Sequence, residues 1–461
     1  MKTHWTTDSI FYHIYPLGLC DAPARNDFTS APVPRLEKIY EWIPHLRELG
    51  INALYLGPLF ESTAHGYDTA DYFHVDRRLG RDETLANLVR ELHRNGIKVI
   101  LDGVFNHVGR DFWAFRDLQQ NGESSRFRDW FQGVDFSARS QFGDAFRYEG
   151  WNGNFDLVKL NPHSPEVRDH LFHAIRSWVQ DFEIDGLRLD VADCLDPQFM
   201  RELSTFCHSL DPDFWLMGEV VHGDYNNWAN PAMLDSVTNY EAYKGLYSSL
   251  ADKNYFEIAY SLKRQFGKGG MYRDLTLYNF ADNHDVNRVA SSLKNPRHLY
   301  PLYCLLFTMP GTPSIYYGSE WGLEGARTPT DDRPLRPALS LNQLRETSPQ
   351  PELPAALARL ASIRLNTSAL RHGDYAEIFV ASEQFAFSRS TQHESVIVLL
   401  NAAAVDVPFD VSVSLPDGTR LVDLLNPADE FRVEGGRLRV EKVHPCWSRI
   451  LQVKNSGLLP T

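Results

Sequence analysis

The segment DFEIDGLRLDVADCL, residues 181–195, combines the pattern of a buried β-strand with two charged side chains. Its Ile, Leu and Val residues are typical of a strand inside a core. Arg188 and Asp190 share one face of that strand, because the side chains of a strand alternate with a period of two residues. Burying charged groups inside a core costs free energy unless they are paired, and they are usually retained there for a function. The segment therefore predicts a buried strand that contributes charged groups to a functional site.

The run at 184–191 is one of eight strand-like runs that precede residue 320. The other seven are at residues 10–16, 51–58, 97–104, 214–220, 234–240, 275–281 and 312–318. Amphipathic helical segments separate these runs, and strands that alternate with helices form parallel sheets. Eight such units predict an α/β fold whose strands close into a (β/α)₈ barrel, the TIM barrel.

Several of the intervening helices have recognisable ends. Asp82 is the candidate N-cap of a helix that stops at Gly96. Ser164–Pro165 and Asp196–Pro197 each place a capping residue before a first-turn proline, an arrangement that favours helix initiation. These signals predict where three of the barrel helices begin.

Two regions depart from the alternating pattern. Residues 108–163 form a long connection with little periodicity, and such a connection in a compact enzyme is usually functional. After about residue 370, short strands are separated by turn signals such as PDG and EGG. We therefore expect the barrel over 1–107 and 164–368, an inserted subdomain over 108–163, and a C-terminal antiparallel β-sandwich domain over 369–461.

Composition and charge exclude several classes of protein. The formal net charge of −14 argues against nucleic-acid and anionic-membrane surfaces. The five cysteines form no CxxC pair, which indicates reduced, buried thiols. The N-terminus lacks the apolar region of a signal peptide, and the most apolar segment, residues 299–311, is too short to span a bilayer. We therefore expect a cytoplasmic protein with no membrane partner.

Polar residues gather where four of the predicted strands end. They are Asp102, Asn106 and His107 in the third run, Arg188 and Asp190 in the fourth, Glu219 in the fifth, and Asn283, His284 and Asp285 in the seventh. Any one acid at a strand end is commonly a cap or turn residue. The carboxyl ends of barrel strands meet at one face, however, so four such ends together predict a single polar site there.

These strand ends carry a recognisable set of motifs. DGVFNH (102–107), GLRLDVAD (186–193), GEV (218–220) and FADNHD (280–285) resemble, in order, the four signature regions of the α-amylase family of glycoside hydrolases and transglycosidases, family 13. RLDVAD and NFDLVKLN (154–161) are most similar to the neopullulanase and cyclomaltodextrinase branch. That branch usually carries an extra N-terminal β-domain, often used for dimerisation. Here the barrel begins near residue 10, so we expect that domain to be absent and the oligomeric state stays open.

The resemblance implies a role for each motif residue. Asp190 would be the catalytic nucleophile, Glu219 the general acid/base, and Asp285 a third carboxylate that binds sugar hydroxyls and stabilises the transition state. Arg188 would hold Asp190 ionised, because a guanidinium lowers the pKa of a carboxyl whereas burial alone raises it. The other implied contacts to the substrate are Tyr67 in HGYD (65–68), which would stack on the sugar, and His107 and His284, which would donate hydrogen bonds to it.

DDRPLR (331–336) resembles the family's loop after the eighth strand. Asp332 and Arg336 would there contact the next sugar inward, and a surface ion pair is the alternative. No HExxH or similar spacing is present among the 17 histidines, so we expect no catalytic metal and no cofactor. Many members of the family bind a structural calcium ion near the position of Asn106.

The resemblance implies a retaining hydrolase that acts on maltooligosaccharides, cyclodextrins or related short α-glucans through a covalent glycosyl-enzyme. A transglycosylase or isomerase, of the glucanotransferase or trehalose and sucrose type, would share the same first step. A more distant alternative is a non-catalytic subunit of a membrane transporter, which would have broken carboxylates and an adjoining membrane span. All three acids are present in this chain.

Overall fold

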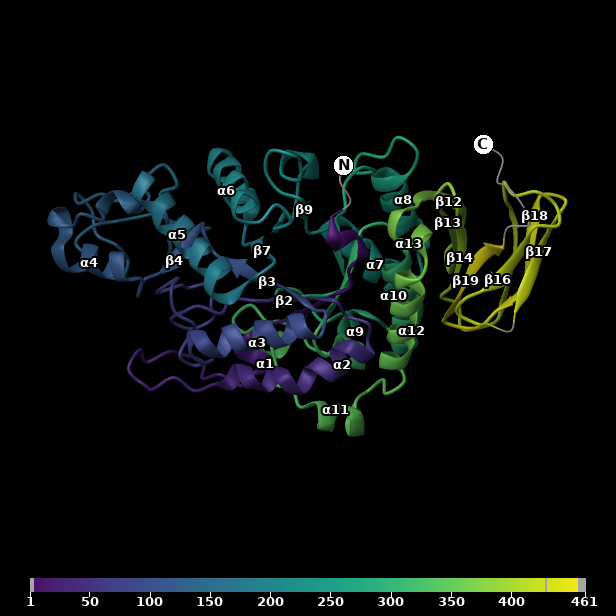
Figure 1. Ribbon diagram of the computed structural model, residues 1–461, viewed down its shortest axis with the longest axis horizontal. Helices are drawn as coiled ribbons and strands as arrows, with labels where there is room; N and C mark the ends of the chain where they lie inside the picture. The colour runs from purple at the N-terminus through teal and green to yellow at the C-terminus, as the bar shows by residue number, and fades with distance from the viewer. Residues whose placement is uncertain (1–3, 428, 455–461) are drawn as a thin grey trace.

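The computed structural model describes residues 4–427 and 429–454, and its largest unit is a closed barrel of parallel strands (Figure 1). The barrel strands are β1 (Phe11–Ile14), β2 (Ala53–Leu56), β3 (Lys98–Gly103), β7 (Gly186–Leu189), β8 (Trp215–Gly218), β9 (Ser236–Val237), β10 (Tyr278–Phe280) and β11 (Thr312–Tyr316). They are hydrogen-bonded in the order β10-β11-β1-β2-β3-β7-β8-β9. A parallel bridge between Thr238 and Tyr278 closes the ring. Each strand falls within one of the eight predicted runs, and the predicted (β/α)₈ barrel is confirmed.

Helices surround the barrel. They are α1 (Pro16–Leu19), α2 (Ile43–Glu48), α3 (Asp82–Arg94), α5 (Pro165–Phe182), α6 (Pro197–Leu210), α7 (Tyr240–Ala251), α8 (Tyr255–Phe266), α9 (Val289–Ser292), α10 (Leu299–Thr308), α11 (Leu341–Thr347), α12 (Leu353–Leu365) and α13 (Ser368–His372). As predicted, α5 and α6 begin with proline after Ser164 and Asp196, and the Asp196 carboxylate accepts a hydrogen bond from the N–H of Phe199.

The predicted N-cap of α3 is wrong by one residue. Arg81 occupies the cap position, and Asp82 is the first helical residue. The Asp82 carboxylate instead accepts a hydrogen bond from the N–H of Val75, 2.8 Å away in the preceding loop, while Thr84 accepts from the N–H of Arg81. The Asp82 side chain therefore binds a backbone group outside the helix instead of capping the helix, as the local pattern had predicted.

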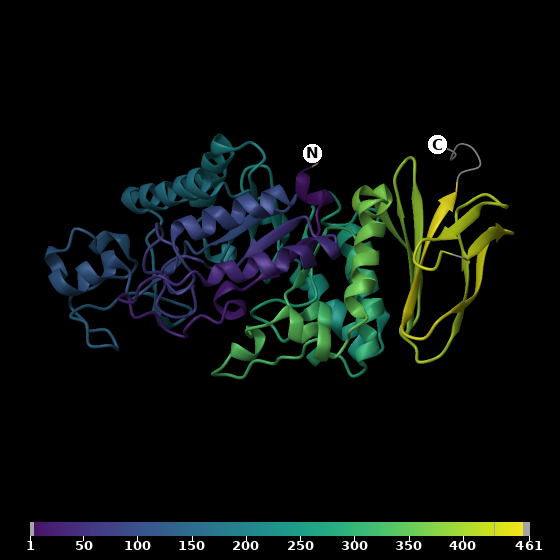
Figure 2. The same ribbon diagram turned by 60° about the horizontal axis from the view of Figure 1, so that its bottom comes forward.

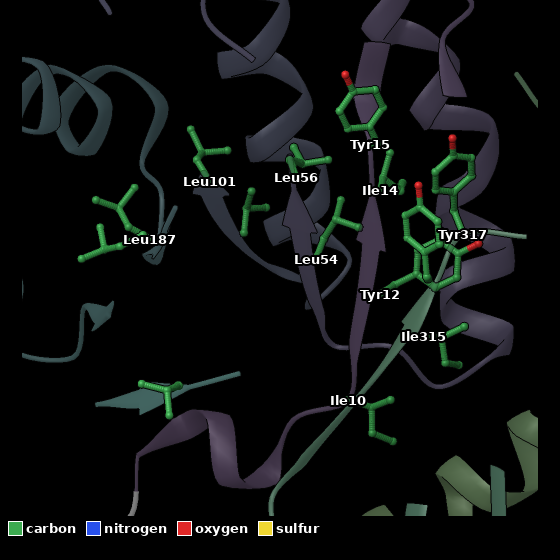
Figure 3. Packing of buried hydrophobic residues seen from close by; sticks show 14 of the residues in the cluster. Ile10, Tyr12, Ile14, Tyr15, Leu54, Leu56, Leu101, Leu187, Ile315 and Tyr317 are labelled. Atoms are coloured by element: carbon green, nitrogen blue, oxygen red, sulfur yellow. The ribbon is translucent and has the colours of Figure 1, made fainter. Parts of the chain in front are cut away.

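Alternation along the strands separates two sets of side chains. One set faces the helices and includes Leu54, Leu56, Leu101 and Leu187, which Figure 3 shows packed around the sheet. The other set fills the lumen and comprises Phe11, Ala53, Tyr55, Ile100, Trp215, Met217, Tyr278 and Phe280. Arg188 lies between Leu187 and Leu189 and therefore points into the lumen, toward the carboxyl ends of the strands. This direction explains why a buried strand carries charges.

The connection between β3 and α5 has its own small sheet. Its strands are β4 (His107–Gly109), β5 (Gly150–Trp151) and β6 (Asn154–Lys159), in the order β4-β6-β5, and α4 (Trp113–Asn121) packs in the same region. Figure 1 shows this segment at the opposite end of the molecule from the last strands of the chain. His107 begins β4, so the small sheet carries one predicted site residue to the barrel.

The chain ends in an antiparallel β domain. Its strands are β12 (Asp374–Val380), β13 (Gln384–Ser390), β14 (Ser395–Asn401), β15 (Val407–Ser412), β16 (Arg420–Asp423), β17 (Glu430–Glu434), β18 (Arg437–Val443) and β19 (Trp447–Lys454), in the order β12-β13-β14-β19-β16-β17-β18-β15. Residues from both halves of this order form a separate apolar core. The yellow strands stand beside α10, α12 and α13 in both views (Figure 1, Figure 2). The C-terminal β domain is confirmed, whereas the exact domain boundaries stay predictions.

The cysteines are all free thiols, as predicted, but one of them is not buried. Cys194 is exposed, because it lies in a short turn (Ala192–Cys194) that leaves the barrel directly after β7. Within residues 4–427 and 429–454, no helix is both long enough and apolar enough to cross a membrane.

Candidate active site

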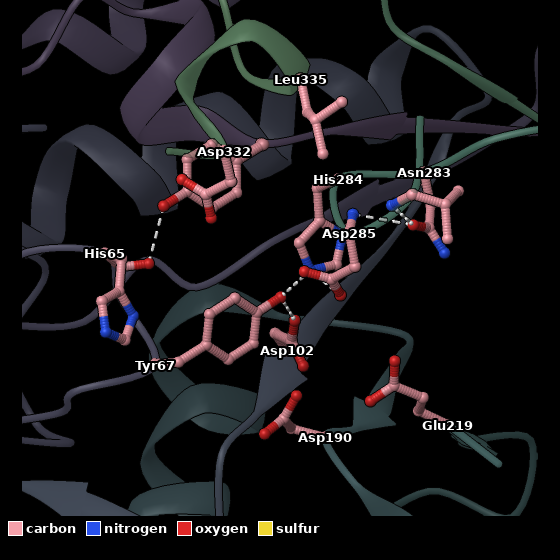
Figure 4. Close-up of polar contacts among 12 residues, drawn as sticks. His65, Tyr67, Asp102, Asp190, Glu219, Asn283, His284, Asp285, Asp332 and Leu335 are labelled. Carbon is pink, nitrogen blue, oxygen red and sulfur yellow. Dashed lines mark hydrogen bonds and ion pairs between the residues drawn. The ribbon is translucent and has the colours of Figure 1, made fainter. Parts of the chain in front are cut away.

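The three predicted catalytic acids lie around one space at the carboxyl ends of the barrel strands. Asp190 follows β7 directly, Glu219 follows β8, and Asp285 lies on the loop after β10. Figure 4 shows their side chains together, with Asp102 and Tyr67 beside them. The Asp190 and Glu219 side chains are each 9% exposed, and that of Asp285 is 36% exposed. The structure thus brings together the acids that the sequence places far apart.

The backbone after β7 is shaped for this arrangement. Val191 has a φ of 41°, in the left-handed region that branched side chains rarely adopt. The turn directs its N–H to Glu219 Oε2, at 3.1 Å, while the N–H of Glu219 donates to the carbonyl of Leu189 at 2.9 Å. Strained residues of this kind are concentrated at functional sites. The hydrogen bond from Val191 holds Oε2 of Glu219 beside the backbone that follows Asp190.

Arg188 is shared by three carboxylates. Its Nη1 lies 2.9 Å from Asp102 Oδ1 and 2.8 Å from Asp190 Oδ1, and its Nη2 lies 2.8 Å from Glu219 Oε2. Burial lowers the pKa of Arg188, but Asp102 and Glu219 outweigh that effect and raise it well above its ordinary value. The guanidinium therefore stays charged. One positive charge cannot balance three negative ones, so this cluster favours retention of a proton.

The pKa of Asp190 differs from the prediction. Burial raises it well above the ordinary range, and the opposing effect of Arg188 is offset by the charges of Glu219 and Asp102. This direction contradicts the prediction that Arg188 holds Asp190 ionised. The two other carboxylates that contact the guanidinium bring negative charge close to Asp190 and so oppose its effect.

This raised pKa leads to a prediction for stability. Because the folded protein keeps a proton on Asp190 that the unfolded chain releases, stability falls as pH rises above the unfolded pKa of about 3.9, until the raised folded pKa is passed. Asp190→Asn removes this loss of stability, so we expect its Tm to exceed that of wild type by about 1–3 °C at pH 7. Near pH 4 the two melting temperatures should coincide. Calorimetry at both pH values measures the difference, and a variant less stable than wild type at pH 7 would contradict the assignment.

Tyr67, His284 and Asp285 form a connected group on the other side of the site. The hydroxyl of Tyr67 donates to Asp102 Oδ2 at 2.9 Å and also contacts His284 Nε2. The Tyr67 and His284 rings stack at 5.4 Å, and His284 Nε2 lies 2.9 Å from Asp285 Oδ2. Burial alone would raise the pKa of Asp285, but His284 and Arg336 hold it well below its usual range. Asp285 is therefore ionised.

The loop after β11 completes this side. Arg336 Nη2 lies 3.0 Å from Asp285 Oδ1, its Nη1 lies 2.8 Å from Asp332 Oδ2, and its guanidinium covers the ring of Tyr15 at 4.6 Å. The Arg336 side chain is 10% exposed. The Asp332 side chain, in contrast, is 49% exposed, so a contact of this pair with the next sugar stays a prediction.

His107 carries an unused hydrogen-bond donor. Burial lowers its pKa to about 3, so the ring is neutral. Asn106 Nδ2 lies 3.1 Å from His107 Nδ1, and since an amide nitrogen donates, Nδ1 accepts and the ring hydrogen is on Nε2. That Nε2 is buried without a partner and lies 3.9 Å from Asp190 Oδ2. It can therefore donate to a ligand bound beside Asp190.

Two residues of this site, Asp102 and Tyr240, have no role predicted from the sequence. Asp102 was visible at a strand end, and the structure places it under Arg188 and the hydroxyls of Tyr55 and Tyr67. Tyr240, which contacts Glu219, is the last residue of the sixth predicted strand-like run, at 234–240, and the structure makes it the first residue of α7. Among the residues that the structure describes, no group of three or more His, Cys, Asp or Glu side chains could hold a metal ion. A calcium ion near Asn106 stays a prediction.

Comparisons with known proteins agree with this geometry. The family described as alpha amylase, catalytic domain, matches residues 14–348. A cyclomaltodextrinase from a Bacillus species is 32% identical over 86% of this chain and 73% of its own. Neopullulanase 2 from Thermoactinomyces vulgaris is 32% identical over 95% of this chain and 76% of its own. The ligand-free structure of cyclic α-maltosyl-(1→6)-maltose hydrolase from Arthrobacter globiformis, 27% identical, superposes with a TM-score of 0.82 over 98% of this chain and 100% of its own.

Proposed function

Because this chain belongs to the alpha-amylase family of glycoside hydrolases, we propose that it hydrolyses α-glucosidic bonds in maltooligosaccharides, cyclodextrins or related short α-glucans with retention of configuration. The observation that carries this proposal is the contact of one buried guanidinium, Arg188, with both Asp190 and Glu219. A retaining glycosidase needs two carboxyl groups flanking the scissile bond, one of which holds a proton while the other attacks.

In the first step, an Asp190 oxygen forms a bond to the anomeric carbon. The bond from that carbon to the glycosidic oxygen breaks, and the leaving oxygen receives the proton of Glu219. The products are a β-linked glycosyl-enzyme, a free sugar hydroxyl and an ionised Glu219. The reaction requires Glu219 to carry this proton while Asp190 is ionised.

In the second step, the carboxylate of Glu219 takes a proton from water while the water oxygen bonds to the anomeric carbon. The ester bond to Asp190 breaks, and the sugar leaves as the α-anomer. Ionised Asp285, held by Arg336 and His284, would bind hydroxyls of the sugar in the site. The free Nε2–H of His107 would donate to the same sugar beside Asp190.

The configuration of the first product tests this mechanism. We expect NMR of maltotriose or cyclodextrin digests to show the α-anomer before mutarotation produces the β-anomer. The double displacement inverts the anomeric carbon twice, so retention is obligatory. A β-anomer formed first would refute the proposal.

A cyclic sugar with α-(1→6) linkages is a second substrate to test in the same assay. The Arthrobacter globiformis hydrolase, which matches this chain along its whole length, is named for a cyclic sugar with α-(1→6) linkages. A panel of that cyclic tetrasaccharide, cyclodextrin, pullulan, isomaltose, trehalose and sucrose would rank the linkages. Longer oligosaccharides among the products would identify the transglycosylase alternative, because a sugar then replaces water in the second step.

We also propose that the reaction needs no cofactor, since two carboxyl groups suffice for its chemistry. The non-catalytic alternative is disfavoured by the intact carboxylate set. A cytoplasmic location is supported by the five unpaired thiols, which suit a reducing compartment.

A further inference from the structure

Tyr240 gives the two oxygens of Glu219 different surroundings. Its hydroxyl lies 3.2 Å from Glu219 Oε1. The other oxygen, Oε2, faces Arg188 Nη2 at 2.8 Å and the N–H of Val191 at 3.1 Å. One carboxyl oxygen therefore meets a hydroxyl, which can donate or accept, and the other meets only donors.

Asn283 fixes the direction of these hydrogen bonds. Its side chain faces the backbone N–H groups of Asp285 and Val286 at 2.8 and 3.2 Å, and backbone N–H groups only donate. The atom facing them is therefore Oδ1, and Nδ2 faces Tyr240, 3.2 Å away, and donates to its hydroxyl oxygen. The hydrogen of that hydroxyl is left free to point at Glu219 Oε1. Burial raises the pKa of Tyr240 well above its usual value, so the hydroxyl keeps this hydrogen.

We propose that Tyr240, held by Asn283, is a positioning residue that orients Oε1, the proton-carrying oxygen of Glu219, and stabilises the carboxylate left when that proton is transferred. This inference rests on the proposed function, in which Glu219 is the acid/base. A proton on Oε2 would face Arg188 and the N–H of Val191, neither of which can accept it. Oε1 is then the oxygen that gives its proton to the leaving group and takes one from water.

The hydrogen bond between Tyr240 and Oε1 of Glu219 changes during the catalytic cycle. Before cleavage, Oε1 carries the proton. When it passes to the glycosidic oxygen and the bond to carbon breaks, the hydroxyl of Tyr240 donates to Oε1, which then shares its negative charge with that hydrogen bond. When water is deprotonated in the second step, Oε1 regains a proton and the tyrosine hydrogen turns away. Tyr240 keeps its own proton throughout.

Tyr240→Phe removes the hydroxyl alone. The ring packs edge-on against Phe280 at 5.0 Å and against Tyr243 at 5.9 Å, and the phenylalanine ring can keep both contacts. Tyr243→Phe is the matched control, because Tyr243 lies one turn along α7 and its ring stacks on Phe280.

The test compares kcat/KM for two substrates with the same sugar and different leaving groups, maltotriose and α-maltosyl fluoride. A hydrogen bond to a charged group contributes enough to rate that we expect Tyr240→Phe to lose about 10- to 100-fold on maltotriose. On the fluoride, which leaves with little help from an acid, the loss should stay within about 3-fold. Tyr243→Phe should match wild type on both, and all three proteins should melt alike.

Equal losses on both substrates, or none on either, would overturn the role of Tyr240. The wild-type enzyme in the same series reports separately on the proposed function, through its hydrolysis of maltotriose to the α-anomer. If wild type fails that measurement, the proposed function is at fault. If wild type passes and Tyr240→Phe shows no dependence on the leaving group, only this inference falls.

Discussion

Asp190→Asn is expected to lower kcat for cyclodextrin and maltotriose by about 10⁴-fold or more, the scale at which loss of a catalytic nucleophile is felt. The carboxamide keeps the shape of the side chain and can still accept a hydrogen bond from Arg188, 2.8 Å away. It cannot form the glycosyl ester. Steady-state kinetics with purified variant measures the loss, and a kcat within about 10-fold of wild type would show that Asp190 is not the nucleophile.

Asp193→Asn is the matched control. It makes the same chemical change three residues further on, at an exposed carboxylate, and should leave kcat unchanged. Asp190→Gly adds a chemical readout, because it opens room for a small anion. With an α-maltosyl fluoride substrate and azide, the anion replaces the missing carboxylate and attacks from the opposite face, so the product should be the β-glycosyl azide.

Glu219→Gln is expected to lose about 10²- to 10⁴-fold on maltotriose, the range that general acid catalysis contributes. The rate of the first step should fall far less on α-maltosyl fluoride, because its leaving group needs little protonation. The glycosyl-enzyme would then accumulate, because water lacks its base. Azide, which needs no base, should release it as the α-glycosyl azide.

The two azide products distinguish the two carboxyl groups. The β-azide with the Asp190 variant and the α-azide with the Glu219 variant would assign one nucleophile and one acid/base. The opposite pairing would exchange the roles. An equal loss of first-step rate on maltotriose and fluoride, with no azide product, would remove Glu219 from the proton transfers. Asp224→Asn, in the exposed loop that follows Glu219, is the control for this series.

Much of the fold could be predicted because local sequence patterns indicate the strands and helices of the barrel. A strand buried on both faces is a short apolar run, and a barrel helix shows one apolar face, so eight runs and their intervening helices were recognisable. The N-cap of α3 could not be predicted in the same way, because Asp82 is taken by the N–H of Val75 in the preceding loop. The exposure of Cys194 could not be predicted either, because it depends on the path of the turn after β7.

The candidate site could likewise be predicted only in part. Strand ends identified Asp190, Glu219 and Asp285, and the period of the strand directed Arg188 inward. The structure added the shared contacts of that guanidinium, which explain why burial outweighs it in setting the pKa of Asp190. It also added Tyr240, which follows β9 and reaches Glu219 because β9 pairs with β8.

The sequence by itself determined that this chain folds into parallel strands with charged groups at one end, since the order and spacing of apolar residues decide which side chains face the lumen. Only the tertiary structure decided how those charges are shared: one guanidinium among Asp102, Asp190 and Glu219. Coulombic interaction and desolvation depend on distance and burial, and residues on three different strands acquire both only after the barrel has formed.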